Sequence, residues 1–319
     1  MFSRFEAWNN ITKNGDNIVI TTHSYPDGDA IGSCYALAQA LKIAGKNPVV
    51  VLSEYNGRFD FVAGKEFVHT GDMDALPCDV FISLDCGDKS RVGSSDALFN
   101  KTSVTINIDH HINNSNFSRY NYIDTEASST CEMIFNIINM SVPITKDIAA
   151  ALYMGIMTDT GSFRFRITSP QTMEIISLLM STGIDFSDIQ LKALHVHSKQ
   201  QAKVFGIALN NMGFADGAPI AFTCISQKEL EAVGGDYNDL GGIAQYMSDI
   251  EGMEVGLLFS ERSGGRLKVS FRSQSIPIND VAIKFGGGGH ELACSAVFEA
   301  NMQKGVDDVL SALRALLAK

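Results

Sequence analysis

NIVITTHSYPDGD, residues 17–29, carries the strongest fold signal in the chain. Its first part, residues 17–22, is a short β-branched apolar run that is typical of a buried strand. A polar loop follows, and residues 31–44 then show a helical pattern. A buried strand that leads through a loop into a helix predicts the start of an α/β domain.

The same alternation continues through the first half of the chain. Further strands are predicted at residues 48–52, 80–84 and 104–108, and helices at residues 128–139, 148–157 and 169–180. Continuous apolar strands interleaved with helices predict a mostly parallel sheet that helices cover on both faces.

The pattern changes after Gly183. Residues 184–210 are polar and helical with little strand signal, and strand-like runs return beyond residue 212. Strands are predicted at residues 220–225, 255–259, 267–271 and 293–298, and helices at residues 227–233, at 240–249 and at the end of the chain. We therefore expect an N-terminal α/β domain over residues 1–186, a helical linker over 187–210 and a smaller α/β domain over 211–319.

Composition and charge restrict the classes of protein to which this chain can belong. The 319 residues include 45% hydrophobic and 19% charged residues, which excludes a largely disordered chain. Lys+Arg 25 against Asp+Glu 36 gives a net charge of −11, which disfavours binding along a long nucleic acid. A short phosphorylated substrate remains compatible if its site supplies positive charge.

The sequence also predicts a cytoplasmic protein with no membrane partner. The longest apolar run, residues 148–157, is shorter than the roughly 18–20 residues of a membrane span, and the first residues, MFSRFEAWNN, show no export signal. Six cysteines without a CxxC pair are expected to be free thiols.

Four segments gather acids and histidines. They are HSYPDGD at 23–29, DCGD at 85–88, DHH at 109–111 and TDTG at 158–161. Three of them follow predicted strands, and the fourth follows an apolar helical run. Ligand sites of open α/β sheets lie at the carboxyl ends of strands, so we expect these side chains to converge. Each motif alone could be a turn or a helix cap, but their joint occurrence favours a site.

The ligand types point to divalent metals. Carboxylate and imidazole suit Mn²⁺, Mg²⁺ or Fe²⁺ better than a structural zinc. There are too many candidate ligands for one ion. Two ions that share a carboxylate are typical of enzymes that catalyse phosphoryl transfer. Asp27, Asp29, Asp85 and Asp159 together carry a charge of −4, which two divalent ions would neutralise.

In order and spacing, these segments resemble the DHH phosphoesterase superfamily. Gly286–Gly289 followed by His290 resembles the signature of its accessory DHHA1 domain, so the resemblance covers nearly the whole chain. Within the superfamily, the chain is most similar to the stand-alone nanoRNases, which act on very short oligoribonucleotides and on 3′-phosphoadenosine 5′-phosphate. The resemblance places the active site in the cleft between the two domains.

The resemblance also implies roles for individual residues. One ion would be held by His23, Asp27 and Asp85, and the other by Asp29, Asp85, His110 and Asp159, so that Asp85 bridges. The catalytic residues would be Asp85, His111 facing the scissile phosphate, and Asp109 orienting an imidazole. A water between the ions would attack.

Substrate binding is expected in the second domain. Arg272 and Ser273, the backbone of Gly287, Gly288 and Gly289, and the ring of His290 are the candidates. Where the family usually has Ala-Ala-Gly, this chain has bulkier residues in ELACSA, residues 291–296. Arg262 and Arg266 flank Ser-Gly-Gly, which predicts a solvated hairpin turn and leaves an accessory phosphate contact open.

The expected function is hydrolysis of short oligonucleotides to 5′-mononucleotides and of 3′-phosphoadenosine 5′-phosphate, supported by two divalent cations, with Mn²⁺ preferred. A phosphodiesterase acting on linear dinucleotides (pApA, pGpG) or cyclic dinucleotides is the enzymatic alternative, and a manganese pyrophosphatase ranks lower. A nucleotide-sensing protein is the non-enzymatic alternative, but it predicts a missing metal ligand, and all six are present. Long duplexes are not expected as partners, and a homodimer is left open.

Overall fold

The computed structural model describes residues 3–73 and 75–318, and the chain divides into two compact units, Met1–Val196 and His197–Lys319. Each unit has its own hydrophobic cores and is described separately. Across the described part of the chain, every helix is too short or too polar to cross a membrane.

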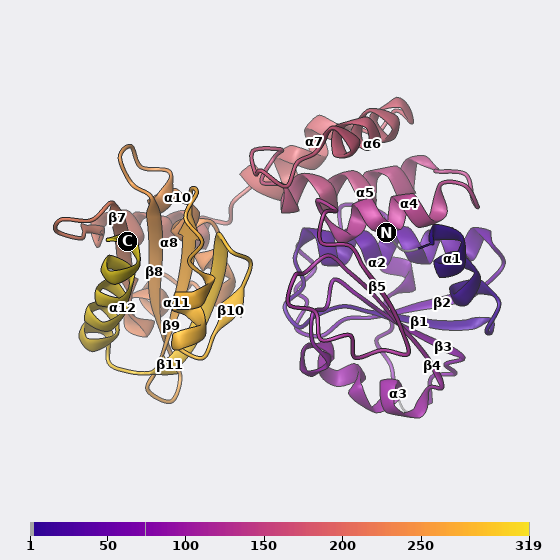
Figure 1. Cartoon of the computed structure of the whole chain (residues 1–319), viewed down its shortest axis with the longest axis horizontal. Helices are drawn as coiled ribbons and strands as arrows, with labels where there is room; N and C mark the ends of the chain where they lie inside the picture. The colour runs from indigo at the N-terminus through magenta and orange to yellow at the C-terminus, as the bar shows by residue number, and fades with distance from the viewer. Residues whose placement is uncertain (1–2, 74, 319) are drawn as a thin grey trace. The chain divides into compact units, whose positions relative to one another are not determined.

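The first unit is built on a five-stranded parallel sheet with the strand order β2-β1-β3-β4-β5 (Figure 1). The strands are β1 (Asn17–Thr21), β2 (Asn47–Val51), β3 (Val80–Leu84), β4 (Val104–Asp109) and β5 (Tyr120–Ile123). The predicted parallel sheet is confirmed. Thr21 pairs with Ser83, and Leu84 pairs with Ile108, so the carboxyl ends of β1, β3 and β4 lie at one edge.

Helices cover both faces of this sheet, as predicted. The larger core packs the sheet against α1 (Arg4–Thr12), α2 (Gly28–Ile43), α4 (Thr130–Ile138), α5 (Lys146–Asp159) and α6 (Pro170–Ser181). On the other face, Val19 and Phe81 of the sheet pack against Leu98 of α3 (Asp96–Lys101). Figure 1 shows α2 and α5 on one side of the sheet and α3 on the other. Shorter elements complete the unit: η1 (Lys65–Phe67), η2 (Lys89–Ser95), α7 (Phe186–Gln190) and η3 (Leu191–His195).

Close packing between helices positions the start of α2. A Cβ added at Gly155 of α5 would lie 2.2 Å from the Cys131 sulfur and 3.1 Å from the Asp29 Cα. A Cβ at Gly32 of α2 would lie 2.5 Å from the Ala151 carbonyl oxygen. Glycine at both positions therefore lets α2, α4 and α5 approach closely enough to bring Asp29 beside the ends of the other two helices.

Gly155→Ala is therefore expected to destabilise the protein by roughly 1–3 kcal/mol, the usual cost of overpacking. Gly206→Ala is the matched control, because Gly206 lies in a helix with nothing within 4 Å of its added Cβ. There the higher helix propensity of alanine should leave stability unchanged or raise it. Urea unfolding of both variants tests the packing, and equal midpoints would contradict it.

The second unit is a six-stranded mixed sheet with the order β10-β11-β9-β8-β7-β6. Its strands are β6 (Gly213–Phe214), β7 (Ile220–Ile225), β8 (Val255–Arg262), β9 (Arg266–Ser273), β10 (Gly288–Gly289) and β11 (Ala293–Glu299). Among the described residues of this sheet, β7 and β8 pair in parallel and the other neighbouring strands pair antiparallel. The predicted hairpin turn joins β8 to β9, with Gly264 and Gly265 at positive φ.

Helices again flank the sheet of the second unit. One core involves α8 (Lys199–Asn210), α9 (Gln227–Ala232), η4 (Tyr237–Leu240) and α10 (Ile243–Ser248), and the other involves α11 (Asn279–Lys284) and α12 (Met302–Leu317). Val204 and Ala208 of α8 are fully buried in the first of these cores. The boundaries predicted at residues 186 and 210 stay predictions, and the boundary between the units in the structure follows Val196.

Candidate metal centre

The six predicted metal ligands lie together at the carboxyl edge of the parallel sheet. Three loops and two helix ends supply them. His23 follows β1, Asp85 follows β3, His110 follows β4, Asp27 and Asp29 begin α2, and Asp159 ends α5. The side chain of Asp27 caps α2 by accepting from the backbone N–H groups of Asp29 and Ala30, both at 3.1 Å. This cap begins the helix earlier than the predicted residue 31.

Asp85 lies at the centre of the cluster. Its Oδ2 is 3.6 Å from His23 Nε2, and its Oδ1 is 3.6 Å from His110 Nε2. His110 Nε2 also lies 3.4 Å from Asp159 Oδ2. The two oxygens of Asp85 therefore face different imidazoles, as a carboxylate shared between two cations would.

Three groups of donor atoms share Asp85, and within each group the atoms lie within 4.8 Å of one another; one of them joins Asp85 to Asp109 and His111, and the other two correspond to the predicted ligand sets. One set is His23, Asp27 and Asp85, and the other is Asp29, Asp85 and His110. Asp29 and Asp85 are 0% and 2% exposed, and burying such carboxylates together is costly without compensating positive charge. Oxygen and imidazole donors, burial and excess negative charge together fit divalent cations.

The N-terminus of α4 holds Asp29 in place. The backbone N–H of Thr130 donates to Asp29 Oδ2 at 2.7 Å, and that of Cys131 donates to Oδ1 at 2.8 Å. The Thr130 hydroxyl donates to Asp85 Oδ1 at 3.2 Å. Unpaired N–H groups and the positive end of the helix dipole stabilise a carboxylate there. The four acid and histidine motifs gave no indication of this contact, although Ser-Ser-Thr at residues 128–130 is a signal for the start of a helix.

The backbone at Asp85 has an unusual conformation. Its φ is +52°, in the left-handed region that few residues other than glycine occupy, although Asp and Asn are enriched there. The Asp85 N–H donates to the Ile108 carbonyl of β4 at 3.0 Å, which fixes the turn directly after β3. This turn directs the carboxylate into the cluster.

Asp109 contacts His111 and is itself held on both oxygens. Asp109 Oδ1 lies 2.6 Å from His111 Nδ1, and Asp109 Oδ2 accepts from the Asn114 amide at 2.6 Å. Asp109 is fully buried, and Asn114 also donates to Asn107 at 2.7 Å. This contact suits the orienting role predicted for Asp109, and neither asparagine was among the predicted site residues.

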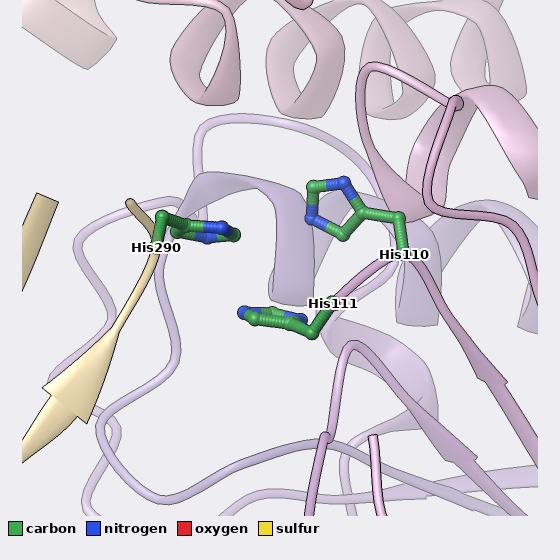
Figure 2. A group of neighbouring side chains, drawn as sticks. All are labelled: His110, His111 and His290. Atoms are coloured by element: carbon green, nitrogen blue, oxygen red, sulfur yellow. The ribbon is translucent and has the colours of Figure 1, made fainter. Parts of the chain in front are cut away.

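His110 and His111 extend from the end of β4 with their rings edge to face, 5.0 Å between centroids and 71° between planes (Figure 2). His110 Nδ1 lies 3.2 Å from the Ala127 carbonyl oxygen, which can only accept a hydrogen bond. The proton of a neutral His110 is therefore on Nδ1, which leaves Nε2 as the donor atom for a metal.

Burial and mutual repulsion distort the pKa values of the cluster. Burial, assisted by the charges of Asp85 and Asp27, raises the pKa of Asp29 to about 7. Burial and the charges of Asp29, Asp27 and Asp85 raise the pKa of Asp159 well above its ordinary value. Burial opposes ionisation of Asp85 as well, but contact with His23 and the charges of the histidines outweigh it and lower its pKa.

The pKa values of the three histidines are raised by the neighbouring acids. Burial lowers the pKa of His23, His110 and His111, but the surrounding carboxylates outweigh burial and raise all three above 6.5. In the metal-free protein, several carboxyl and imidazole groups of the cluster therefore carry protons. Divalent cations would displace these protons on binding.

These shifts predict how the metal-free protein responds to pH. A carboxyl group whose pKa rises on folding stabilises the protein below its unfolded pKa, and this contribution is lost as pH rises through the folded pKa. For Asp29 that window runs from 3.8 to about 7, and the raised histidines extend the loss above 6.5. The Tm in EDTA is therefore expected to fall between about pH 5 and pH 8.

Mn²⁺ should abolish the fall of Tm with rising pH, because a bound cation favours the ionised form of its ligands. Thermal unfolding in EDTA and in Mn²⁺ across this range provides the measurement. A Tm in EDTA that rises with pH would contradict the assignment of the raised pKa values.

The predicted substrate-binding residues all lie in the second unit. Arg272 and Ser273 end β9, and the Ser273 hydroxyl donates to Glu254 at 3.1 Å. The glycine turn needs its glycines, because a Cβ at Gly287 would lie 2.1 Å from the Ser295 carbonyl oxygen and Gly289 has φ +141°. Gly288 and Gly289 form β10, and the backbone of His290 closes a turn with Ala293.

Comparisons with known proteins identify the family of both units. Residues 17–156 match the DHH family, N-terminal domain, and residues 221–319 match the DHHA1 domain. The chain is 30% identical over 306 residues to the bifunctional oligoribonuclease and PAP phosphatase NrnA of Thermus thermophilus, covering 95% of this chain and 90% of that protein. A protein of the same name from Mycoplasma genitalium is 28% identical over 309 residues, with 95% and 94% covered.

A solved structure shows the same architecture. The crystal structure of an exopolyphosphatase-related protein from Bacteroides fragilis has a TM-score of 0.90 and 28% identity, covering 99% of this chain and 98% of that one. These matches extend over both units. The chain belongs to the DHH family and carries a DHHA1 domain in its second unit.

Proposed function

We propose that the chain is a metal-dependent phosphoesterase that hydrolyses short oligoribonucleotides to 5′-mononucleotides, and 3′-phosphoadenosine 5′-phosphate to AMP. The observation that carries the proposal is the pair of ligand sets joined at Asp85, with the Asp109–His111 pair beside them. The names of the bacterial relatives, an oligoribonuclease and PAP phosphatase, support the same class of substrate.

The ligand sets favour two divalent cations. His23, Asp27 and Asp85 would hold one, and Asp29, Asp85, His110 and Asp159 the other, with Mn²⁺ preferred over Mg²⁺ or Fe²⁺. Bound there, the cations would supply the positive charge that lowers the pKa of an attacking water and neutralises the phosphoryl oxygens. Neutral His110 presents Nε2, and the N-terminus of α4 keeps both oxygens of Asp29 oriented.

His111 and Asp109 supply the acid–base chemistry. The contact of Asp109 Oδ1 with His111 Nδ1 fixes the imidazole and favours its protonated form. A protonated His111 can donate to a phosphoryl oxygen or give its proton to the departing ribose oxygen. Asp109 acts through His111 and is a positioning residue, held in turn by Asn114.

The second unit would bind the parts of the substrate that do not react. The Arg272 guanidinium offers charge-assisted hydrogen bonds to phosphate, and the turn at Gly287, Gly288 and Gly289 offers backbone N–H groups that no Cβ obstructs. Ser273 and His290 complete the proposed contacts. The location of the active site between the two units, a cytoplasmic location, a homodimer and the exclusion of long duplexes all stay predictions.

A substrate screen with Mn²⁺ tests the function. We expect rapid hydrolysis of dinucleotides and of 3′-phosphoadenosine 5′-phosphate, slower hydrolysis as RNA lengthens, and little hydrolysis of pyrophosphate. Equal rates on a dinucleotide and on a long single strand would contradict the proposed preference for short substrates. Including pApA and pGpG in the screen tests the alternative of a dinucleotide phosphodiesterase. That alternative predicts that pApA and pGpG are hydrolysed far faster than unphosphorylated dinucleotides and 3′-phosphoadenosine 5′-phosphate.

A further inference from the structure

Glu132, in the first turn of α4, is a buried acid that has no part in the proposed chemistry. Its side chain belongs to a residue that is only 3% exposed. Its Oε2 accepts from the Ser128 hydroxyl at 2.5 Å and from the Thr172 hydroxyl at 2.8 Å. Burying a carboxylate costs free energy that a leucine of similar size would not cost, so stability alone does not account for this residue.

The contact joins the starts of two helices. Ser129 caps α4 by accepting from the Glu132 N–H at 3.1 Å, but the Glu132 side chain is directed to Ser128 and Thr172. At α6, Ser169 and Thr172 form a capping box, in which each side chain accepts from the backbone N–H of the other. This capping box fixes the Thr172 side chain, whose hydroxyl then donates to Glu132. The start of α4 is thereby tied to the start of α6.

The start of α4 also holds one of the two ligand sets. Residues 127–131 contact all three of its members, Asp29, Asp85 and His110. Two backbone N–H groups of this segment donate to Asp29, a hydroxyl donates to Asp85, and a carbonyl oxygen lies 3.2 Å from His110 Nδ1. The serine that Glu132 holds lies inside this segment. Glu132 therefore anchors the backbone that orients these ligands.

The other ligand set depends on local contacts. His23 Nδ1 lies 2.9 Å from the carbonyl oxygen of the next residue, and Asp27 accepts from two N–H groups in the first turn of α2. Of the predicted ligands, Asp159 also belongs with His110, and α6 begins one loop after it. A displacement of α4 against α6 would therefore disturb the ligands of one cation more than those of the other.

We propose that Glu132 is a positioning residue for one metal site only. Through its contact with Thr172 it fixes residues 127–131, and so sets the affinity for the cation held by Asp29 and His110. The affinity for the cation beside His23 does not depend on this contact. The inference rests on the proposed function, which assigns the two cations.

Mn²⁺ binding to the metal-free, full-length protein tests this role without turnover. Thr172→Val removes the hydroxyl at nearly constant volume and alters no residue that contacts a ligand. We expect it to weaken one of two bound Mn²⁺ ions by about 10–100-fold, the usual effect of losing a group that orients metal ligands. Calorimetry and the electron paramagnetic resonance signal of free Mn²⁺ provide the measurement. Glu132→Leu should have the same effect, and Glu132→Gln should retain most of the affinity, because one amide oxygen can accept from both hydroxyls.

Two background variants assign the weakened ion to its site. His23→Gln and His110→Gln each remove a ligand that belongs to one set only. In His23→Gln, Thr172→Val should still weaken the remaining ion by about 10–100-fold. In His110→Gln, Thr172→Val should leave the affinity for the remaining ion unchanged.

Thr223→Val is the matched control. Thr223 is fully buried in the second unit, and its hydroxyl donates to the Ala208 carbonyl at 2.7 Å. Losing this buried hydrogen bond should leave Mn²⁺ affinity unchanged. Equal effects of Thr172→Val in the two histidine backgrounds, or an effect no larger than that of Thr223→Val, would overturn the proposal.

Failure of this role is distinct from failure of the proposed function. If Thr172→Val left Mn²⁺ binding unaltered in a protein that hydrolyses dinucleotides, the role of Glu132 would be refuted and the phosphoesterase would stand. If Thr172→Val weakened one ion as expected in a protein that hydrolyses no nucleotide, the role of Glu132 would stand and the proposed function would be refuted.

Discussion

Asp85→Asn is expected to lower kcat by at least about 10³-fold, because cations at a phosphoryl centre contribute several kcal/mol to the transition state and each 1.36 kcal/mol is tenfold. Asp85 is the residue that both ligand sets share, so removing its charge weakens both at once. The variant should also bind fewer divalent cations per chain. Steady-state kinetics in Mn²⁺ and elemental analysis of the purified variant provide the two measurements.

The choice of asparagine keeps the variant folded. Asp85 has φ +52°, and asparagine is, with aspartate, among the residues that best tolerate this region. Asp147→Asn is the control, because Asp147 is an exposed carboxylate in the first turn of α5 and does not belong to the cluster. Undiminished metal content in Asp85→Asn would refute the bridging role, even if activity fell.

His111→Gln is expected to lower kcat by roughly 10²–10⁴-fold, the range for loss of a general acid or base. Metal content should stay as in the unaltered protein, because His111 belongs to neither proposed ligand set. Asp109→Asn should show a smaller loss of roughly 10–100-fold, as expected for a residue that acts through its neighbour. Single-turnover kinetics with a dinucleotide separates these effects from product release.

His195→Gln serves as the control for histidine removal, because His195 is exposed in the first unit and outside the cluster. The proposed proton donor also predicts a pH signature. The unaltered enzyme should lose kcat on the alkaline side as His111 deprotonates, and this limb should be absent in His111→Gln. A His111→Gln variant that loses metal but keeps the alkaline limb would show that His111 is a ligand instead.

The sequence predicted most of the fold because apolar periodicity and burial coincide. β1, β3, β4, β7 and β11 lie within a residue of their predicted bounds. The missed elements are those with little apolar signal. α1 buries only Ala7 and Ile11, and β5 is four residues long with one buried side chain, Tyr122.

The site, like the fold, could be predicted from the sequence only in part. Acid and histidine motifs at strand ends revealed where the side chains converge, because sheet topology brings those ends to one edge. The contacts that fix the ligands depend on tertiary packing instead. The α4 N–H groups reach Asp29 across about a hundred residues of chain, and the Glu132–Thr172 contact joins separate helices. Local sequence patterns do not encode such pairs.

The account depends most directly on how many cations the active protein binds. Elemental analysis of the Mn²⁺-loaded enzyme, with anomalous diffraction at the manganese edge, measures that number and their positions. We predict two ions per chain that share Asp85, one beside His23 and the other beside His110. A single ion, or an active protein with none at these residues, would contradict the account.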